Sequence, residues 1–249
     1  MSRDHIAIPK FIEEGFSKDG KTFVYDLIRD NEYIGSIKKL GTKNNYYDND
    51  VEKDILGSKV ELEFSIIYHN ICNAKNVVEM KHIIDDNFQL IERFFSFMFL
   101  RSKKTLDTIN KECISTKIIG DIDHSELLRI QANTHTNPLS VIGKEYHFYP
   151  LINLSNKLFI NNSVGFGLMK NKNGEYSFII PLNTELAIII TNIDIGKNNS
   201  HLFIEKEDEN KVDRINKKIC EMEKAYGNGF IFGIDECDIT AYKEFIKRC

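Results

Sequence analysis

Residues 77–100 read VVEMKHIIDDNFQLIERFFSFMFL, and this stretch decides the fold of the N-terminal half. Its apolar residues recur every three or four positions on one broad arc, while polar residues such as Lys81, Asp85 and Gln89 cover the other side. The spacing predicts one amphipathic helix over about residues 76–103. Arg101 falls on the flank of the apolar arc, where its guanidinium needs a partner because an unpaired buried charge is very costly.

The preceding segment, residues 51–71, also has a helical period. A 3.6-residue turn places Glu52 and Glu63 on one line between two apolar stripes and directs Glu61 to the solvent side. Gly57 interrupts the segment, and a kink there would rotate this assignment.

The second half of the chain is rich in β-branched and aromatic runs of strand length. Strands are predicted over residues 146–154, 157–161, 164–169, 176–182, 186–191 and 230–234, with a hairpin turn at 172–174. Helices are predicted from the Asp123–Glu126 start signal onward, over 207–226 and over 239–248. The fold class is therefore α+β, with a helical N-terminal half packed on a mixed, mostly antiparallel C-terminal sheet. The 249 residues can form one domain, or two lobes over residues 1–140 and 141–249, the second ending in two helices.

Composition limits the functions that the chain can have. Its formal net charge of −4 favours a protein partner or self-association over a surface that grips nucleic acid. No apolar run is long enough to span a bilayer, and residues 1–5 carry no secretory signal, so no membrane partner is expected. Five scattered cysteines without a Cys-x-x-Cys pair indicate reduced thiols, a cytoplasmic location and no zinc site.

Glu63 and Arg101 are the main candidate catalytic residues. Glu63 can act as a metal ligand or general base, but a structural ion pair with Arg101 is the favoured interpretation. Arg101 can clamp a phosphate or carboxylate, and the pair with Glu63 or a charge at the helix C-terminus is again favoured.

Three further residues are weaker candidates. His5 is a candidate general base, although a histidine near a terminus is more often a surface residue. Asn161 and Asn162 are candidate ligand-binding residues in a polar turn, where loop chemistry alone also favours asparagine.

Six short motifs are spread through most of the chain. They are Pro9-Lys10-Phe11 with Phe16, Phe23-Val24-Tyr25-Asp26, the acidic helix around Glu61 and Glu63, 99–102, 158–162 and 180–183. Together these motifs resemble the bacterial domain of unknown function 4238 family. The chain departs from the family pattern at three places. His5 lies one residue further from Pro9, Ser102 replaces threonine, and Asn161-Asn162-Ser163 replaces Ser-Asp-Asn-Pro. The resemblance implies a fold, and it also suggests a setting in phage defence or a mobile element, but it brings no established reaction.

Two function classes follow. The leading one is an interaction or sensing module without an evident cofactor, because no complete catalytic constellation is present in the sequence. The alternative is a nuclease or phosphodiesterase that depends on Mg²⁺ or Mn²⁺. In that case Glu63, Asp26 and Glu52 are the candidate metal ligands, Arg101 stabilises phosphoryl charge and His5 moves protons.

Overall fold

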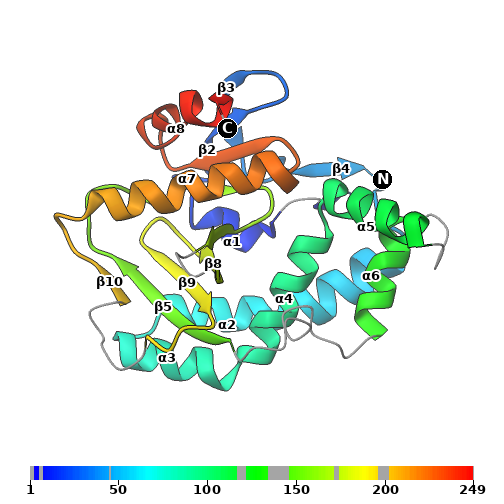
Figure 1. The fold of residues 1–249 in the computed structure, drawn as a ribbon, viewed down its shortest axis with the longest axis horizontal. Helices are drawn as coiled ribbons and strands as arrows, with labels where there is room; N and C mark the ends of the chain where they lie inside the picture. The colour runs from blue at the N-terminus through cyan, green and yellow to red at the C-terminus, as the bar shows by residue number, and fades with distance from the viewer. Residues whose placement is uncertain are drawn as a thin grey trace.

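The computed structural model describes residues 3–5, 8–44, 46–116, 122–133, 146–170, 174–195 and 202–248, and it confirms the α+β class. Helices dominate the N-terminal half, and two mostly antiparallel sheets contain the strands of the C-terminal half (Figure 1). One continuous apolar core includes Phe64 from the helical half and Leu151 and Val212 from the second half. The predicted packing of helices on sheet is thus present.

The N-terminal helices are α1 (Lys10–Glu14), the π-helix η1 (Val51–Glu61), α2 (Leu62–Cys72), α3 (Val77–Asp86), α4 (Phe88–Leu100), α5 (Lys103–Thr116) and α6 (His124–Asn133). They differ from the prediction in two ways. The single helix predicted over 76–103 is split at Asn87, whose side-chain amide donates to the Ile83 carbonyl at 2.8 Å and so competes with the backbone. Helix α5 was not predicted, whereas α6 starts as expected, with the Asp123 carboxylate accepting from the Glu126 N–H at 2.8 Å.

The five-stranded sheet has the order β10-β5-β9-β8-β7. Its strands are β5 (His147–Asn153), β7 (Gly167–Lys170), β8 (Tyr176–Pro181), β9 (Leu186–Thr191) and β10 (Phe203–Ile204). All neighbours are antiparallel except β10 and β5. The predicted strands over 146–154, 176–182 and 186–191 are confirmed. The one over 164–169 begins only at Gly167, and the predicted turn residues 172 and 173 lie outside the described residues.

The four-stranded sheet joins strands from both ends of the chain in the order β3-β2-β11-β6. Its members are β2 (Lys21–Asp26), β3 (Asn31–Ser36), β6 (Asn161–Asn162) and β11 (Phe230–Gly233). The strand predicted over 157–161 is wrong, since only the short β6 forms there. A separate ladder pairs β1 (Arg3–His5) with β4 (Thr42–Asn44).

Helix α7 (Glu209–Tyr226) lies between the two sheets, with α8 (Glu236–Arg248) beside it (Figure 1). It crosses β7 at Gly167, where an added Cβ would lie 3.0 Å from Ile219 Cδ1 and 3.1 Å from the Ile219 nitrogen. A glycine at this position permits the close approach of helix and strand. The helix thereby contributes side chains to both faces of the five-stranded sheet.

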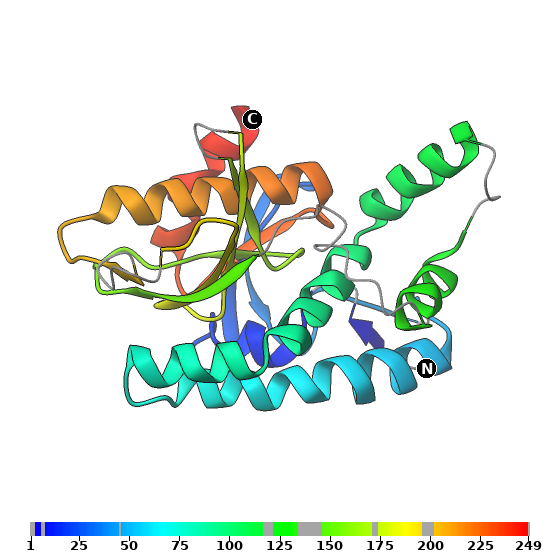
Figure 2. The same cartoon turned by 60° about the horizontal axis from the view of Figure 1, so that its bottom comes forward.

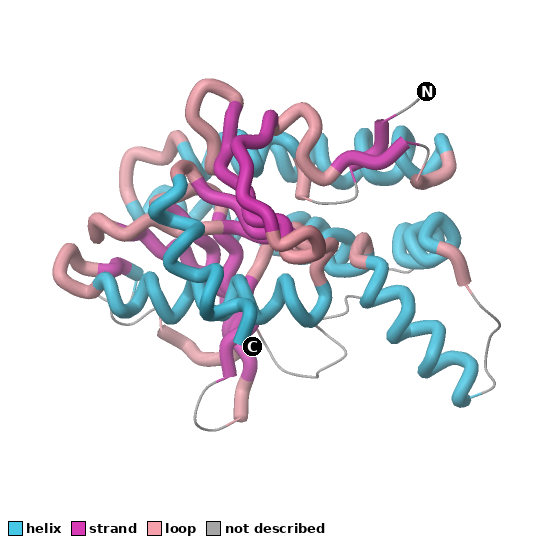
Figure 3. Tube along the Cα trace, turned by 90° about the horizontal axis from the view of Figure 1, so that it is seen from above, coloured by secondary structure: helices cyan, strands magenta, loops and turns pink. Residues whose placement is uncertain are grey.

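The remaining helices form a layer beside the sheets. Helices η1 and α2 run end to end as one rod (Figure 2), while α5 and α6 lie away from the five-stranded sheet (Figure 3). Helix α1 lies between this layer and the four-stranded sheet, because Phe11 packs on Phe64 of α2 and Phe16 on Phe232 of β11.

Candidate functional site

Arg101 is fully buried, with 2% of its surface exposed, at the C-terminal end of α4. Its guanidinium pairs with Glu61, and Nη1 lies 3.8 Å from the sulfur of Met98. Burial acts to lower the pKa of Arg101, but the negative charge of Glu61 outweighs it, helped by Tyr47 and Glu52, so the pKa is raised. Arg101 is therefore a charged residue inside the helical layer.

The predicted pair between Glu63 and Arg101 is wrong. The Glu63 side chain is 44% exposed, and its carboxylate lies 3.8 Å from Arg93. The reason is the π-helix η1, whose i→i+5 bonding continues to the bond from Leu62 N–H to the Gly57 carbonyl. Glu52 and Glu61 are nine residues apart, about two and a half α turns, which would put them on opposite sides of an α-helix. The wider π turn instead lets both carboxylates act on Arg101.

A polar network surrounds the α4–α5 junction. Tyr46 Oη lies 2.8 Å from Nδ1 of the buried His124, and His124 Nε2 lies 3.3 Å from the Ser102 carbonyl. The Ser102 hydroxyl donates to the Tyr226 carbonyl at the end of α7. These contacts connect α6, the α4–α5 junction and α7, and the sequence did not predict that Tyr46 and His124 meet.

Asn161 and Asn162 are both completely buried. The Asn162 amide donates to the Phe166 and Ile219 carbonyls at 3.0 and 2.8 Å, and its oxygen accepts from the Val164 and Gly165 N–H groups. Asn161 donates to the Pro181 carbonyl at 3.2 Å. These contacts hold the backbone, so the ligand-binding role of the two residues stays a prediction.

Glu223 of α7 is a second buried ionisable residue that the sequence did not indicate. Its carboxylate accepts from Ser163 N–H at 2.8 Å, from Gly229 N–H at 2.6 Å and from Phe230 N–H at 2.9 Å, and the Ser163 hydroxyl also donates to it. Burial raises the pKa of Glu223 against the opposing effect of these donors. The carboxylate fastens the segment after β6 and the start of β11 to α7.

The candidate metal ligands have different surroundings. Asp26 closes a turn by accepting from Ile28 N–H at 2.9 Å and Arg29 N–H at 3.0 Å, whereas Glu63 faces Arg93 and Glu52 acts on Arg101. The backbone of His5 pairs with Thr42 in the two-stranded ladder. Within the described ranges, no three His, Cys, Asp or Glu side chains are grouped so that they could hold a metal ion.

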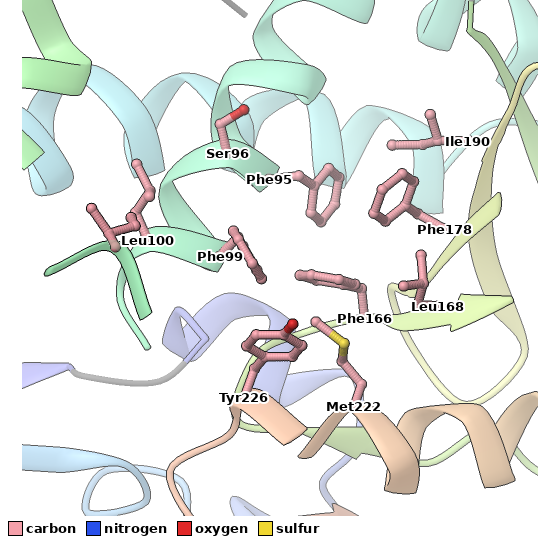
Figure 4. Close-up of a pocket in the computed structure, with 11 residues that line it drawn as sticks. Phe95, Ser96, Phe99, Leu100, Phe166, Leu168, Phe178, Ile190, Met222 and Tyr226 are labelled. Atoms are coloured by element: carbon pink, nitrogen blue, oxygen red, sulfur yellow. The ribbon is translucent and has the colours of Figure 1, made fainter. Parts of the chain in front are cut away.

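The most distinctive concave feature is an apolar pocket of about 420 Å³ between α4, the five-stranded sheet and α7 (Figure 4). One wall is the cross-strand row Leu168–Phe178–Ile190, in which the strand pairing aligns β7, β8 and β9. The lining is apolar except for one serine and one tyrosine hydroxyl, and consists of Phe95, Ser96, Phe99, Leu100, Ile109, Phe166, Leu168, Phe178, Ile190, Met222 and Tyr226.

Aromatic rings enclose much of this pocket. Phe99 lies 5.9 Å from Phe166 and 5.5 Å from Tyr226, and Phe166 lies 5.8 Å from Phe178, measured between ring centroids. In Figure 4 these rings surround a common space rather than stacking face to face. The Ser96 hydroxyl donates a hydrogen bond to the backbone carbonyl of Glu92 at 2.9 Å. The arrangement can hold an apolar molecule and offers little to a charged one.

Glu92 lies one turn before Ser96 on the same line of α4. Burial raises the pKa of this half-buried carboxyl to about 7.

Comparison with family models, with curated proteins and with solved structures found no match to this chain. In the part of the chain that the structure describes, no helix combines the length and apolar character needed to cross a membrane.

Proposed function

We propose that this protein is a ligand-binding module and that the pocket between α4, the β7–β8–β9 face and α7 binds an apolar small molecule. The observation that carries the proposal is a recess of about 420 Å³ lined almost entirely by apolar side chains. Small-molecule sites are concave and mostly apolar, with volumes of roughly 300–1,000 Å³. Protein interiors otherwise pack densely and leave few voids larger than a water molecule.

The chemistry of the lining selects a neutral ligand. No Lys, Arg, Asp or Glu lines the pocket among the described residues, so a charged group there would lose its hydration without a partner. The rings of Phe99, Phe166 and Phe178 suit a ligand with an aromatic or flat apolar part, because tilted rings pack well against another ring.

The position of the pocket supports a sensing role. Its walls come from the helical layer, through Phe95 and Phe99, and from the sheet and α7, through Phe178 and Met222. A ligand that binds there contacts both parts and stabilises their packing, since a ligand that binds only the folded state adds stability by mass action.

We also propose a cytoplasmic location. Cys72 and Cys237 form no disulfide among the described residues, which supports a reducing compartment.

The binding test uses N-phenyl-1-naphthylamine, a neutral aromatic probe that fluoresces in apolar sites. Leu168→Phe adds a ring to the pocket wall, and Ile34→Phe is the control because this residue of β3 is 69% exposed and lines neither the pocket nor another recess among the described residues. We expect saturable binding that Leu168→Phe weakens by about tenfold or more and Ile34→Phe changes by less than about twofold. Absence of saturable binding to the wild type, or equal effects of the two variants, would contradict the proposal.

A further inference from the structure

A second recess lies on the opposite face of the same five-stranded sheet. Its volume is about 450 Å³, and its floor is Leu151, Met169, Ile179 and Ile189. These residues alternate along β7, β8 and β9 with the residues of the apolar pocket, so the two recesses share one sheet and face opposite directions. Helix α7 covers this second face mostly with residues 211–218. These residues precede Ile219, which packs on Gly167 of β7.

The rim of this recess is strongly basic. Five cationic side chains line it, against one carboxylate, Glu221, and they are Lys170, Lys211, Arg214, Lys217 and Lys218. Asp213 adds a second carboxylate nearby by pairing with Lys217 at 2.7 Å, so five positive charges face two negative ones. This local excess of positive charge occurs in a chain whose formal net charge is −4.

Some of these cations are already engaged. Lys217 pairs with Asp213, and Lys218 pairs with Glu221 at 2.6 Å. Lys211 donates to the Phe203 carbonyl at 3.3 Å, which does not neutralise its charge. Arg214 is exposed, and no carboxylate of the described residues pairs with its guanidinium. Lys170, Lys211 and Arg214 are therefore the cations with charge to offer to an anion, and Lys211 and Arg214 lie one turn apart on α7.

The floor of the recess favours a ligand that also has an apolar part. It is apolar, and the recess is also lined by Phe245 of α8, with Lys217 Nζ 5.5 Å from the ring centroid. An inorganic anion would use only the rim, and a neutral molecule only the floor. A ligand with an apolar body and one anionic group uses both.

We propose that this recess binds a small amphipathic anion, with its apolar body on Ile179 and Ile189 and its anionic group at Lys211 and Arg214. Arg214 can accept a carboxylate, sulfonate or phosphate through paired N–H donors. The observations favour a small anion over a nucleic acid, because the cations line one concave apolar floor and the four on α7 extend only over residues 211–218, about two turns of the helix.

The test compares two probes that share one ring system. 8-Anilinonaphthalene-1-sulfonate has the body of the neutral probe N-phenyl-1-naphthylamine and adds one sulfonate. The double variant Lys211→Glu with Arg214→Glu should weaken binding of the sulfonate probe by about tenfold or more and leave the neutral probe within about twofold. The control, Lys38→Glu with Lys39→Glu, makes the same change in net charge at exposed residues between β3 and β4 and should change neither probe.

Each other outcome overturns the proposal. If the sulfonate probe is insensitive to the Lys211/Arg214 variant but lost in Leu168→Phe, it occupies the apolar pocket, and the proposed function stands while this inference fails. If the control weakens the sulfonate probe equally, the effect is one of net charge. If a single-stranded oligonucleotide displaces the sulfonate probe at a lower concentration than the small anion dodecyl phosphate, the recess is a nucleic-acid site instead.

Discussion

Glu13 is the most unusual single residue of the described chain. It lies on α1 with no exposed surface, and neither carboxyl oxygen has a hydrogen-bond partner among the described residues. Burial raises its pKa to about 9, so at neutral pH this carboxyl is protonated. Because the pKa is higher in the folded state than in the unfolded chain, its contribution to stability is fully present below about pH 4.5 and is lost as the pH rises toward 9.

Glu13→Gln should remove this pH dependence, because glutamine has a similar shape and cannot ionise. The difference in unfolding free energy between the variant and the wild type should grow in favour of the variant by roughly 1.4 kcal/mol for each pH unit between about 5 and 8. Urea unfolding at several pH values measures it. Glu14→Gln is the control on the same helix, since Glu14 is 50% exposed and 3.4 Å from Lys10. A difference that does not change with pH would show that Glu13 is ionised or solvated.

The sequence predicted that Arg101 needs a partner, and the structure confirms that it is buried and paired. It did not reveal that the carboxyl groups of Glu13 and Glu223 are buried. Their burial follows from contacts between segments far apart in the chain, such as Glu223 with Ser163, and such contacts leave no local pattern.

At the scale of elements, η1 decides which carboxylate reaches Arg101. A hydrophobic period reports which residues share a face only if the turn is regular, and the i→i+5 bonds of η1 change that turn. The sequence correctly predicts a helical segment over 51–71 and indicates that a kink at Gly57 would change which residues share a helix face. Its 3.6-residue period nevertheless directs Glu61 to the solvent. Strand positions at β5, β8 and β9 were predictable because each has a run of β-branched or aromatic residues of strand length.

Glu61→Gln tests this assignment directly. It leaves the buried guanidinium of Arg101 without its main counter-charge and should lower the unfolding free energy by about 2 kcal/mol or more. Glu63→Gln, two residues away and largely exposed, should change it by less than about 0.5 kcal/mol. Urea unfolding of both variants under one condition gives the comparison. A larger loss for Glu63→Gln would restore the α-helical assignment.

For the whole molecule, the central feature is the way α7 crosses β7 at Gly167. The crossing gives the five-stranded sheet an aromatic pocket on one face and a basic recess on the other. The sequence identified Phe95 and Phe99 as part of an apolar arc, but periodicity cannot distinguish a packed core from the wall of a cavity. It also could not show that β2 pairs with β11, because that pairing joins segments about 200 residues apart.

The most direct test of the account is a crystal structure of the protein soaked with iodobenzene, in which anomalous scattering locates the iodine. Apolar cavities of smaller volume than this one bind benzene or xenon. We predict an iodine peak inside the apolar pocket, between Phe99 of α4 and Phe178 of β8. A structure in which the protein's own side chains fill this space, with no iodine peak there, would contradict the proposed ligand-binding function.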